Sequence, residues 1–331
     1  MIRLHIPGFF ASDFSKGETR LGDGQIIDDG TNYEVIDGYC GKGTTRLISA
    51  LKERKITRPY LHISHAHYDH YYGIRKIIND PYFAPRGLYL YNPDTLGDVS
   101  NDVKSEKATL RTIIDEAKAK KIPVHYLKDG NTIEHGKIKI KVYRDQPTSY
   151  HGNSDAYINN GSLCYWFPEQ SYLTTGDAGL ECAIKHNLHP KLIKLGHHGN
   201  DCVRSVATWL KNHGCIFCWD NDYSAKLTDF LMTGREDALA VGMTYLSCHG
   251  DINVIFASTA AIVYKDGKYW TYKCSYKEKA TLKSADLKTV IATMKGNYGS
   301  SNERTTALLN KGYWASQIQN KINEIYKIVR G

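Results

Sequence analysis

The sequence predicts an α/β sandwich followed by a small helical unit. Over residues 1–275, short apolar strands alternate with amphipathic helices in two similar halves. Alternation of this kind gives sheets that are covered by helices. Near residue 276 the chain becomes polar and Lys-rich (SYKEKATLKSAD), and the remainder has a helical pattern with a Gly-rich break, KGNYGSSNE. We therefore expect a large domain over 1–275, a linker over 276–284 and a helical unit over 285–331.

The first half of the large domain opens with an expected strand in MIRLHIPGFF. The segment GQIIDDGTNYEVID is typical of a strand pair, because an Asp-Gly turn separates two apolar runs. TTRLISALKERKI has apolar residues at helical spacing and a basic end, as helix C-termini prefer. RPYLHIS is the next expected strand, the charged run from Ser105 to Lys121 an amphipathic helix, and DGNTIEHGKIKIKVY a strand pair.

The second half continues the alternation of strands and helices. The expected strands are SLCYWF, SYLTTGD, KLIKLGHHGN, CIFCWDN, INVIFAS and AIVYKDGKYWTYK, and the last forms a hairpin around Asp266-Gly267. Helices are expected in LECAIKH, SVATWLKNH and GREDALAVGM. Strands and helices thus alternate to the end of the large domain.

Composition limits the function classes only loosely. The chain has 331 residues, 41% of them apolar and 24% charged, and a net charge of +8. A basic excess favours anionic partners such as phosphodiesters, teichoic acids or nucleic acid. An ordinary solvated surface without such a partner can carry the same net charge. There is no apolar run of about 20 residues to insert into a membrane. The N-terminus lacks a signal-peptide pattern, so we expect a cytoplasmic protein, or one released to the cell wall by a signal-independent route.

The cysteines do not indicate a disulfide scaffold or a structural zinc site. Eight of them are scattered through the chain, unlike the dense spacing of small secreted domains. Cys215 and Cys218 form a CxxC pair, but no second pair or nearby histidine completes a zinc set. We expect these thiols to be buried and reduced.

A cluster of metal-binding residue types directly follows an apolar strand. The segment HISHAHYDHYYG places His65, His67, Asp69 and His70 within six residues. Imidazole nitrogens and carboxylate oxygens bind zinc at about 2.0–2.2 Å, so several must converge on one point. A tight loop at a strand end allows this convergence, whereas packing alone gives no reason for such a cluster. The sequence therefore predicts a metal site here.

This cluster resembles the signature of the metallo-β-lactamase superfamily, which implies an αββα sandwich with a two-metal site. By resemblance, His65 and His67 bind the first metal, and Asp69 and His70 bind the second. The segment TTGD resembles the motif whose aspartate, here Asp177, bridges both metals. The cofactors expected are two divalent ions, Zn²⁺ or alternatively Mn²⁺.

A later double histidine resembles a more specific motif. LGHHGN is similar to segments of the hydrolase domain of the DNA-uptake competence protein and of phosphorylcholine esterases. The resemblance assigns His198 to the second metal and His197 to the substrate or transition state, although the two could be exchanged. As catalytic residues we expect Asp69, which can orient the attacking water, and His197, which can stabilise developing negative charge.

The sequence departs from the family pattern at the third ligand of the first metal. Many members have a histidine there, whereas this chain offers Asn159, Asn160 or His151 from the preceding loop. Asp37, in YEVIDGY, and His62, on the strand before the cluster, are expected to support the ligands without binding metal, although His62 could equally be a core residue.

The C-terminal segment resembles the cell-wall-binding repeat of certain phage lysozymes. VIATMKGNYGSSNERTTALLNKGYWASQIQNKINEI has the apolar pair, Gly-rich turn, Gly-Tyr and final helix of that repeat. The resemblance implies Gram-positive peptidoglycan or teichoic acid as a partner, with Tyr298 and Arg304 as candidate contacts. An ordinary helical cap is the alternative.

Three functions are consistent with these features. The first is a two-zinc phosphodiesterase or related hydrolase acting on a Gram-positive envelope and encoded by a phage. The second is a metal-dependent nuclease or cyclic-nucleotide phosphodiesterase. The third is a wall-binding protein with an inactive hydrolase domain, against which the intact metal-ligand pattern speaks.

Overall fold

The computed structural model describes residues 1–8, 22–145, 150–199, 203–220, 236–247, 250–257, 260–274, 287–297 and 315–330. The chain divides into two compact units, Met1–Tyr276 and Lys277–Gly331. The expected linker, 276–284, lies outside the described residues, so its bounds stay a prediction. In the part of the chain that is described, no helix combines the length and apolar character needed to cross a membrane.

The first sheet of the large unit has nine strands in the order β16-β15-β14-β1-β2-β3-β4-β5-β6. Strands β3 to β6 run parallel and the other neighbours are antiparallel. Their bounds are β1 Ile2–Ile6, β2 Gly24–Asp28, β3 Tyr33–Gly38, β4 Tyr60–His62, β5 Gly87–Tyr91, β6 Val124–Leu127, β14 Ile252–Ala257, β15 Ala260–Lys265 and β16 Lys268–Lys273.

The second sheet has seven strands in the order β13-β12-β11-β10-β9-β8-β7. Strands β10 to β13 are parallel, and β7 to β10 pair antiparallel. Their bounds are β7 Thr132–His135, β8 Ile138–Tyr143, β9 Cys164–Phe167, β10 Tyr172–Thr174, β11 Leu192–Lys194, β12 Phe217–Asp220 and β13 Thr244–Ser247. Strand β13, like β5 and β6 of the first sheet, falls in a segment to which the sequence analysis assigned no element.

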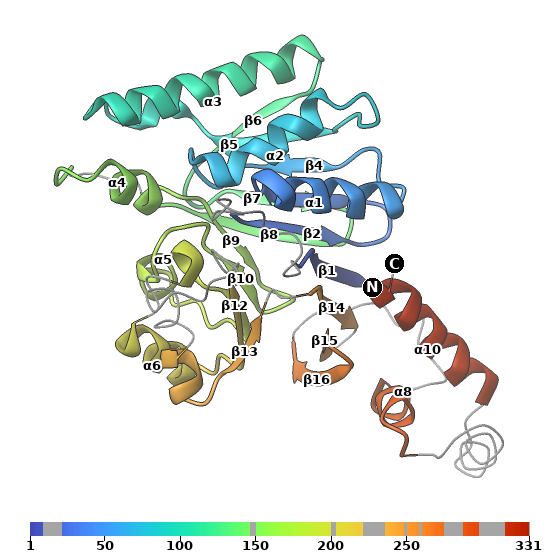
Figure 1. The fold of residues 1–331 in the computed structure, drawn as a ribbon. Helices are drawn as coiled ribbons and strands as arrows, with labels where there is room; N and C mark the ends of the chain where they lie inside the picture. The colour runs from blue at the N-terminus through green and yellow to red at the C-terminus, as the bar shows by residue number, and fades with distance from the viewer. Residues whose placement is uncertain are drawn as a thin grey trace. The chain divides into compact units, whose positions relative to one another are not determined.

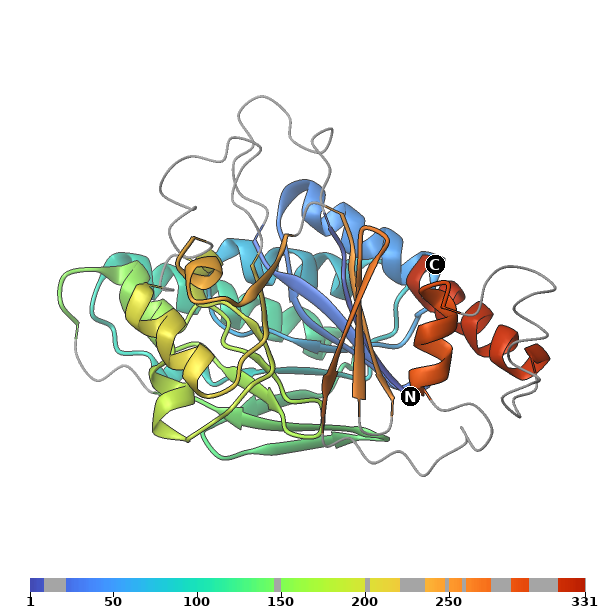
Figure 2. The same cartoon turned by 90° about the horizontal axis from the view of Figure 1, so that it is seen from below.

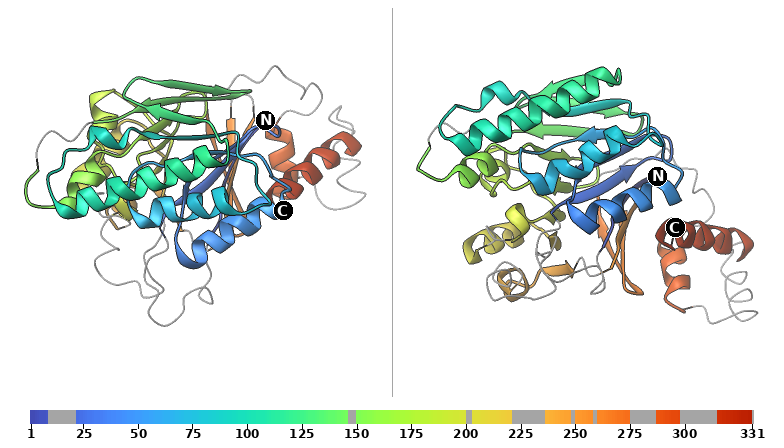
Figure 3. Two further views of the ribbon diagram at one scale, coloured as in Figure 1. Left: turned by 90° about the horizontal axis from the view of Figure 1, so that it is seen from above. Right: turned by 45° about the horizontal axis from the view of Figure 1, so that its top comes forward.

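Helices cover the outer faces of both sheets. Helices α1 (Gly41–Glu53), α2 (Tyr68–Asn79) and α3 (Asn101–Ala119) lie along the first sheet, while α5 (Glu181–Lys185) and α6 (Arg204–Asn212) lie along the second (Figure 1). Seen from below, the blue strands run between the blue-to-cyan helices and the green strands (Figure 2). The views from above and at 45° agree with this order (Figure 3). The αββα layering predicted for this chain is therefore confirmed.

The burial pattern of the second sheet explains why it has helices on one face only. Along β10 and β12, side chains alternate between two apolar clusters. Tyr172 and Phe217 belong to the core between the sheets, whereas Leu173 and Cys218 pack with residues of α5 and α6. The cysteines that the structure describes are all buried, as expected.

Local side-chain contacts set the bounds of two predicted elements. The turn between β2 and β3 is closed by Asp29, whose Oδ1 accepts hydrogen bonds from the backbone nitrogens of Thr31 and Asn32. The expected helix from Ser105 instead begins at Asn101, because the Ser100 hydroxyl accepts a hydrogen bond from Val103 N at 3.2 Å. A serine in that position satisfies a backbone donor of the first turn. The prediction missed this cap, so it began the helix one turn late.

The smaller unit contains helices α8 (Leu287–Met294) and α10 (Ala315–Arg330). In α10, Ile318, Ile322, Ile325 and Val329 are buried at the three- and four-residue spacing of one helix face. The candidate wall-binding residues Tyr298 and Arg304 lie outside the described residues.

Candidate metal centre

The metal-ligand candidates meet where parallel strands of both sheets end. His65 follows β4, and Asp37 lies at the end of β3. In the other sheet, Asp177 follows β10 and His198 follows β11. The apolar strands thus place these polar side chains at one edge of the sandwich.

Two close backbone contacts hold α2 against this edge. A Cβ atom at Gly73 would lie 1.7 Å from the carbonyl oxygen of Gly38, so only glycine lets the helix approach β3 so closely. A Cβ atom at Gly22 would lie 1.9 Å from the carbonyl oxygen of Asp69, and this glycine has a φ of +74°. The same carbonyl accepts a hydrogen bond from Asp23 N at 3.2 Å. Asp23 is therefore fixed beside the start of α2.

The first donor group consists of His65, His67 and Asp177. Nε2 of His65 lies 3.1 Å from Nδ1 of His67 and 3.7 Å from Oδ2 of Asp177. One ligand atom from each of the three lies within 4.8 Å of the others. These three side chains can therefore contact a single cation.

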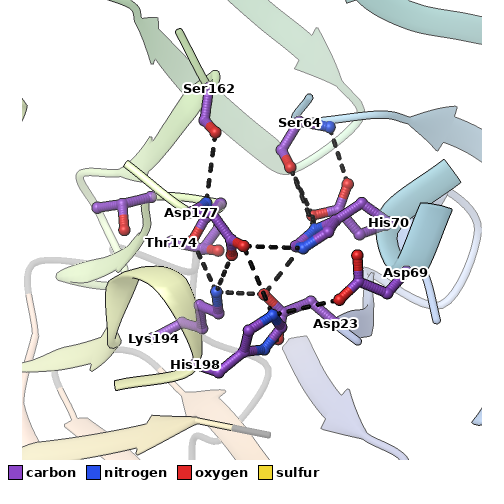
Figure 4. A network of polar contacts seen from close by, with 12 residues as sticks. Asp23, Ser64, Asp69, His70, Ser162, Thr174, Asp177, Lys194 and His198 are labelled. Carbon is purple, nitrogen blue, oxygen red and sulfur yellow. Dashed lines mark hydrogen bonds and ion pairs between the residues drawn. The ribbon is translucent and has the colours of Figure 1, made fainter. Parts of the chain in front are cut away.

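The second donor group shares Asp177 with the first. It consists of Asp23, His70, Asp177 and His198. Oδ2 of Asp177 lies 3.3 Å from Nε2 of His70 and 3.5 Å from Nε2 of His198 (Figure 4). Asp69 adjoins this group, with Oδ2 3.4 Å from Nε2 of His198. Asp177 therefore stands between two adjoining sets of donors, the position that the sequence assigned to a bridging carboxylate.

The two histidines of the GHHG turn have different surroundings. Both have left-handed backbones, with φ of 47° at His197 and 52° at His198. This conformation is unfavourable for residues other than glycine. His198 is buried among the donors, whereas His197 is half-buried and belongs to neither donor group. Their rings lie 6.0 Å apart. Of the two alternatives left open by the sequence, the geometry favours His198 as the ligand.

Asp37 supports one ligand directly. Its Oδ1 accepts a hydrogen bond from Ser64 N at 2.8 Å, and its Oδ2 accepts from Ser64 Oγ at 2.7 Å and from Nδ1 of His70 at 2.9 Å. Such a carboxylate fixes the tautomer and orientation of a metal-binding imidazole. It leaves Nε2 of His70 facing Asp177.

His62 lies in a separate hydrogen-bond network. Its Nε2 donates to Oε2 of Glu34 at 2.8 Å, and Oε1 of the same buried carboxylate accepts from Nδ1 of His135 at 2.8 Å. The His62 ring stacks on Tyr89 with centroids 4.9 Å apart. His135 belongs to β7 of the second sheet, whereas Glu34 and His62 belong to the first sheet. These contacts therefore connect the two sheets.

The three candidates for the missing ligand differ in burial. Asn159, at the end of helix α4 (Ser154–Asn160), is 4% exposed and its Oδ1 has no hydrogen-bond partner. Asn160 and His151 are exposed. Sequence reasoning also missed Asp155, whose Oδ1 lies 3.7 Å from Nε2 of His67, on the side away from His65. Of the three candidates, Asn159 is therefore the one with a buried side-chain oxygen that still needs a polar partner.

Asp23 and Lys194 also escaped sequence reasoning. Lys194 is only 1% exposed, and its ammonium donates to the carbonyl oxygen of Gly176 at 2.6 Å and to Oδ1 of Asp177 at 3.3 Å, and it pairs with Oδ2 of Asp23. A lysine is almost never fully buried unless it is paired. Its place in the apolar strand KLIKLGHHG, directly before the double histidine, was the available signal.

Opposing charges dominate the protonation of the cluster. Burial disfavours the charged form of Asp177, but His70, His198 and Lys194 outweigh it and hold the pKa of this carboxyl well below its usual range. Burial likewise opposes a charge on His198, yet Asp177 and Asp23 raise its pKa to about 10. Burial, with repulsion from His70, holds the pKa of His65 well below its usual value. The neutral imidazole is the form that binds a metal ion, so this direction favours binding at His65.

The donor set fits divalent cations. Among the described residues of the cluster, four buried carboxylates (Asp23, Asp37, Asp69 and Asp177) face one permanent cation, Lys194. Uncompensated buried charge is costly, so such a cluster favours bound cations. Imidazole and carboxylate ligands suit zinc and, with more oxygen, manganese. His65, His67, Asp69, His70, Asp177 and His198 are the residues that would hold these ions.

Comparison with known proteins adds likeness of fold only. No family model and no curated protein matches the sequence. The metallo-beta-lactamase fold protein YhfI from Bacillus subtilis is 14% identical, with a TM-score of 0.46 over 75% of this chain and 96% of that one. Igni18, a metallo hydrolase from Ignicoccus hospitalis, is 12% identical, with a TM-score of 0.47 over 77% and 100%. At these values no residue role is carried over from either protein.

The layering defines the fold class of the large unit. It is an αββα sandwich of the metallo-β-lactamase fold, with a cluster of side chains that could hold metal ions at the edge where strands of both sheets end.

Proposed function

We propose that this protein is a metal-dependent hydrolase that uses two divalent ions, Zn²⁺ or Mn²⁺, to cleave phosphodiesters. One observation carries the proposal: Oδ2 of Asp177 faces imidazole nitrogens from both donor groups, at 3.7 Å from His65 and 3.3 Å from His70. A carboxylate shared in this way brings two cations close together. Two adjoining cations are the usual apparatus for in-line displacement at phosphorus.

In this proposal, different residues hold the metal ions and stabilise the transition state. When bound, the two ions polarise the substrate and lower the pKa of an attacking water towards neutrality. His65 and His67 would hold the first ion, and Asp69, His70 and His198 would hold the second. To His197, which is half-buried and whose ring lies 6.0 Å from that of His198, we assign the role of donating a hydrogen bond to the oxygen on which negative charge develops. A donor of this kind contributes about 3–4 kcal/mol to transition-state stabilisation in other hydrolases.

Charge and motif favour a phosphodiester over a neutral substrate. The chain carries a net charge of +8, which attracts anions. The LGHHGN segment resembles that of hydrolases acting on phosphodiesters. The intact donor set counts against an inactive wall-binding protein.

A substrate panel tests the proposal. Protein stripped by a chelator and reloaded with zinc or manganese is assayed on bis(p-nitrophenyl) phosphate, p-nitrophenyl phosphate, a chromogenic lactam and a lactone. We expect metal-dependent cleavage of the diester, abolished in Asp177→Asn. Hydrolysis of the lactam or lactone alone would overturn the choice of phosphorus. The same assay is extended to single-stranded DNA, cyclic nucleotides and wall-derived diesters, and preferred cleavage of the DNA or cyclic nucleotides would select the nuclease alternative.

We further propose that residues 285–331 direct the enzyme to a Gram-positive cell wall, and that a phage encodes it. This rests on the sequence resemblance, since Tyr298 and Arg304 lie outside the described residues. Sedimentation with purified walls, with and without teichoic acid, tests it. Tyr298→Ala and Arg304→Ala in the full chain should reduce binding. Binding of these variants at the wild-type level would contradict the assignment.

A further inference from the structure

We propose that Lys194 and Asp23 form a buried positioning pair that aims Asp177 and His198 at the second metal ion. The inference rests on the proposed two-metal function and adds two residues to it. Neither residue touches a substrate, because both side chains are buried. Their effect is exerted through the ligands that they hold.

The ammonium of Lys194 holds one side of Asp177. A lysine has three N–H donors, and three acceptors surround this one: Oδ1 of Asp177, the carbonyl oxygen of Gly176 and Oδ2 of Asp23. Because Oδ1 of Asp177 is engaged, Oδ2 is the oxygen that faces the histidines (Figure 4). Lys194 therefore decides which oxygen of Asp177 faces the histidines and would be available to the ions.

Asp23 extends the same arrangement to His198. Its Oδ1 lies 3.5 Å from Nδ1 of His198, while Nε2 of that ring faces Asp69 and Asp177. Asp23 thus stands to His198 as Asp37 stands to His70: a carboxylate on the nitrogen turned away from the ligand cluster. Although Asp23 belongs to the second donor group, its oxygens face Lys194 and His198, which makes it a support for the site.

The pair also joins the two sheets at the site. Asp23 immediately precedes β2 of the first sheet, and Lys194 ends β11 of the second. Their contact therefore fixes the distance between strand ends that carry ligands of the same ion. An alternative role for Lys194 is only to balance the charge of the neighbouring carboxylates. The positioning role and the charge-balance role predict different metal affinities for a variant that has the wild-type total charge but lacks the ammonium.

The experiment measures metal binding in the full chain. Wild type, Lys194→Met, Asp23→Asn and the double variant Lys194→Met/Asp23→Asn are compared by metal content after dialysis, zinc affinity against a chromophoric chelator, and the visible spectrum of the cobalt-loaded protein. The double variant has the same total charge as wild type and leaves neither member of the pair as an unpaired buried charge. It therefore keeps the test possible if the single variants do not fold. Lys107→Met is the matched control, because Lys107 is a buried lysine that donates to Leu96 O and pairs with Asp98.

A positioning role predicts that affinity for the second ion falls about 10- to 100-fold in all three site variants, with an altered cobalt spectrum, and stays unchanged in Lys107→Met. Wild-type affinity in the double variant would show that Lys194 only balances charge and would overturn the proposal. Unchanged binding in Lys194→Met would do the same. Wild-type protein that binds two ions yet cleaves no diester would defeat the proposed function and leave this inference intact.

Discussion

Nε2 of His70 lies 3.3 Å from Oδ2 of Asp177, while Nδ1 of the same ring donates to Oδ2 of Asp37 at 2.9 Å. The imidazole is therefore held between a carboxylate of the first sheet and one that follows a strand of the second. Burial opposes a charge on this ring, but Asp177 and Asp37 outweigh it and raise the pKa of His70 well above its usual value. A cation must displace that proton to bind Nε2, so metal uptake should strengthen with rising pH.

Removing the carboxylate behind His70 should weaken metal binding without removing a ligand. We expect Asp37→Asn to lower affinity for the second ion about 10- to 100-fold, because His70 loses the acceptor that fixes its tautomer. Competition with a chromophoric chelator measures this. Asp28→Asn is the control, since Asp28 is a buried carboxylate paired with Arg3 away from the cluster. Equal losses in both variants would indicate a general structural effect.

Alanine substitutions should separate the two adjacent histidines. His198→Ala should lose one ion per chain, because its ring lies among the donors. His197→Ala should keep the full metal content and lower kcat about 100-fold or more, as loss of an oxyanion donor does. Metal analysis and steady-state kinetics on the same preparations give both values. The reverse pattern would show that the roles are exchanged.

Glu34 should matter for stability and not for metal. Glu34→Gln weakens the contact with both His62 and His135, and disrupting a buried pair of this kind costs about 3–5 kcal/mol in the free energy of unfolding. Denaturant unfolding measures that loss. Metal content per folded chain should equal that of wild type. A reduced metal content would mean that His62 supports the ligands after all.

Glu106 on α3 should make the metal-free protein less stable as pH rises. Burial, followed by repulsion from Asp155, Asp69 and Asp102, raises the pKa of Glu106 to about 7. Because the folded-state pKa exceeds the unfolded one, its stabilising contribution is complete below about pH 4.5 and is lost as pH rises through about 7.

Glu106→Gln removes this titration. The variant should therefore gain stability relative to wild type between pH 5 and pH 8. The gain should be about 1–2 kcal/mol, since the side chain is partly exposed and solvent screens it. Chemical unfolding at a series of pH values, with a chelator present, measures the difference. A difference that is constant with pH would contradict the assignment.

Local pattern was enough to predict most of the strands and helices. Alternating apolar residues and turn signals located the strand pair β2–β3 and the hairpin β15–β16. The spacing of ligand residue types located the cluster after β4, but Asp69 and His70 lie in the first turn of α2 and not in the loop that was expected. The start of α3 was missed because a single serine hydroxyl sets it. Strands β5, β6 and β13 and helix α2 were also missed. Strand β13 is short and is defined by its pairing with β12.

The sequence by itself determined the alternation of strands and helices and the cluster at residues 65–70, because hydrophobic periodicity and the spacing of ligand residues are local properties. Only the tertiary structure decided which distant side chains complete the cluster. Asp23 and Lys194 lie 171 positions apart in the chain (194 − 23) and meet because β2 of one sheet begins at the edge where β11 of the other ends. Their pairing depends on sheet order and on burial that makes an unpaired charge costly, and neither is visible in a linear pattern.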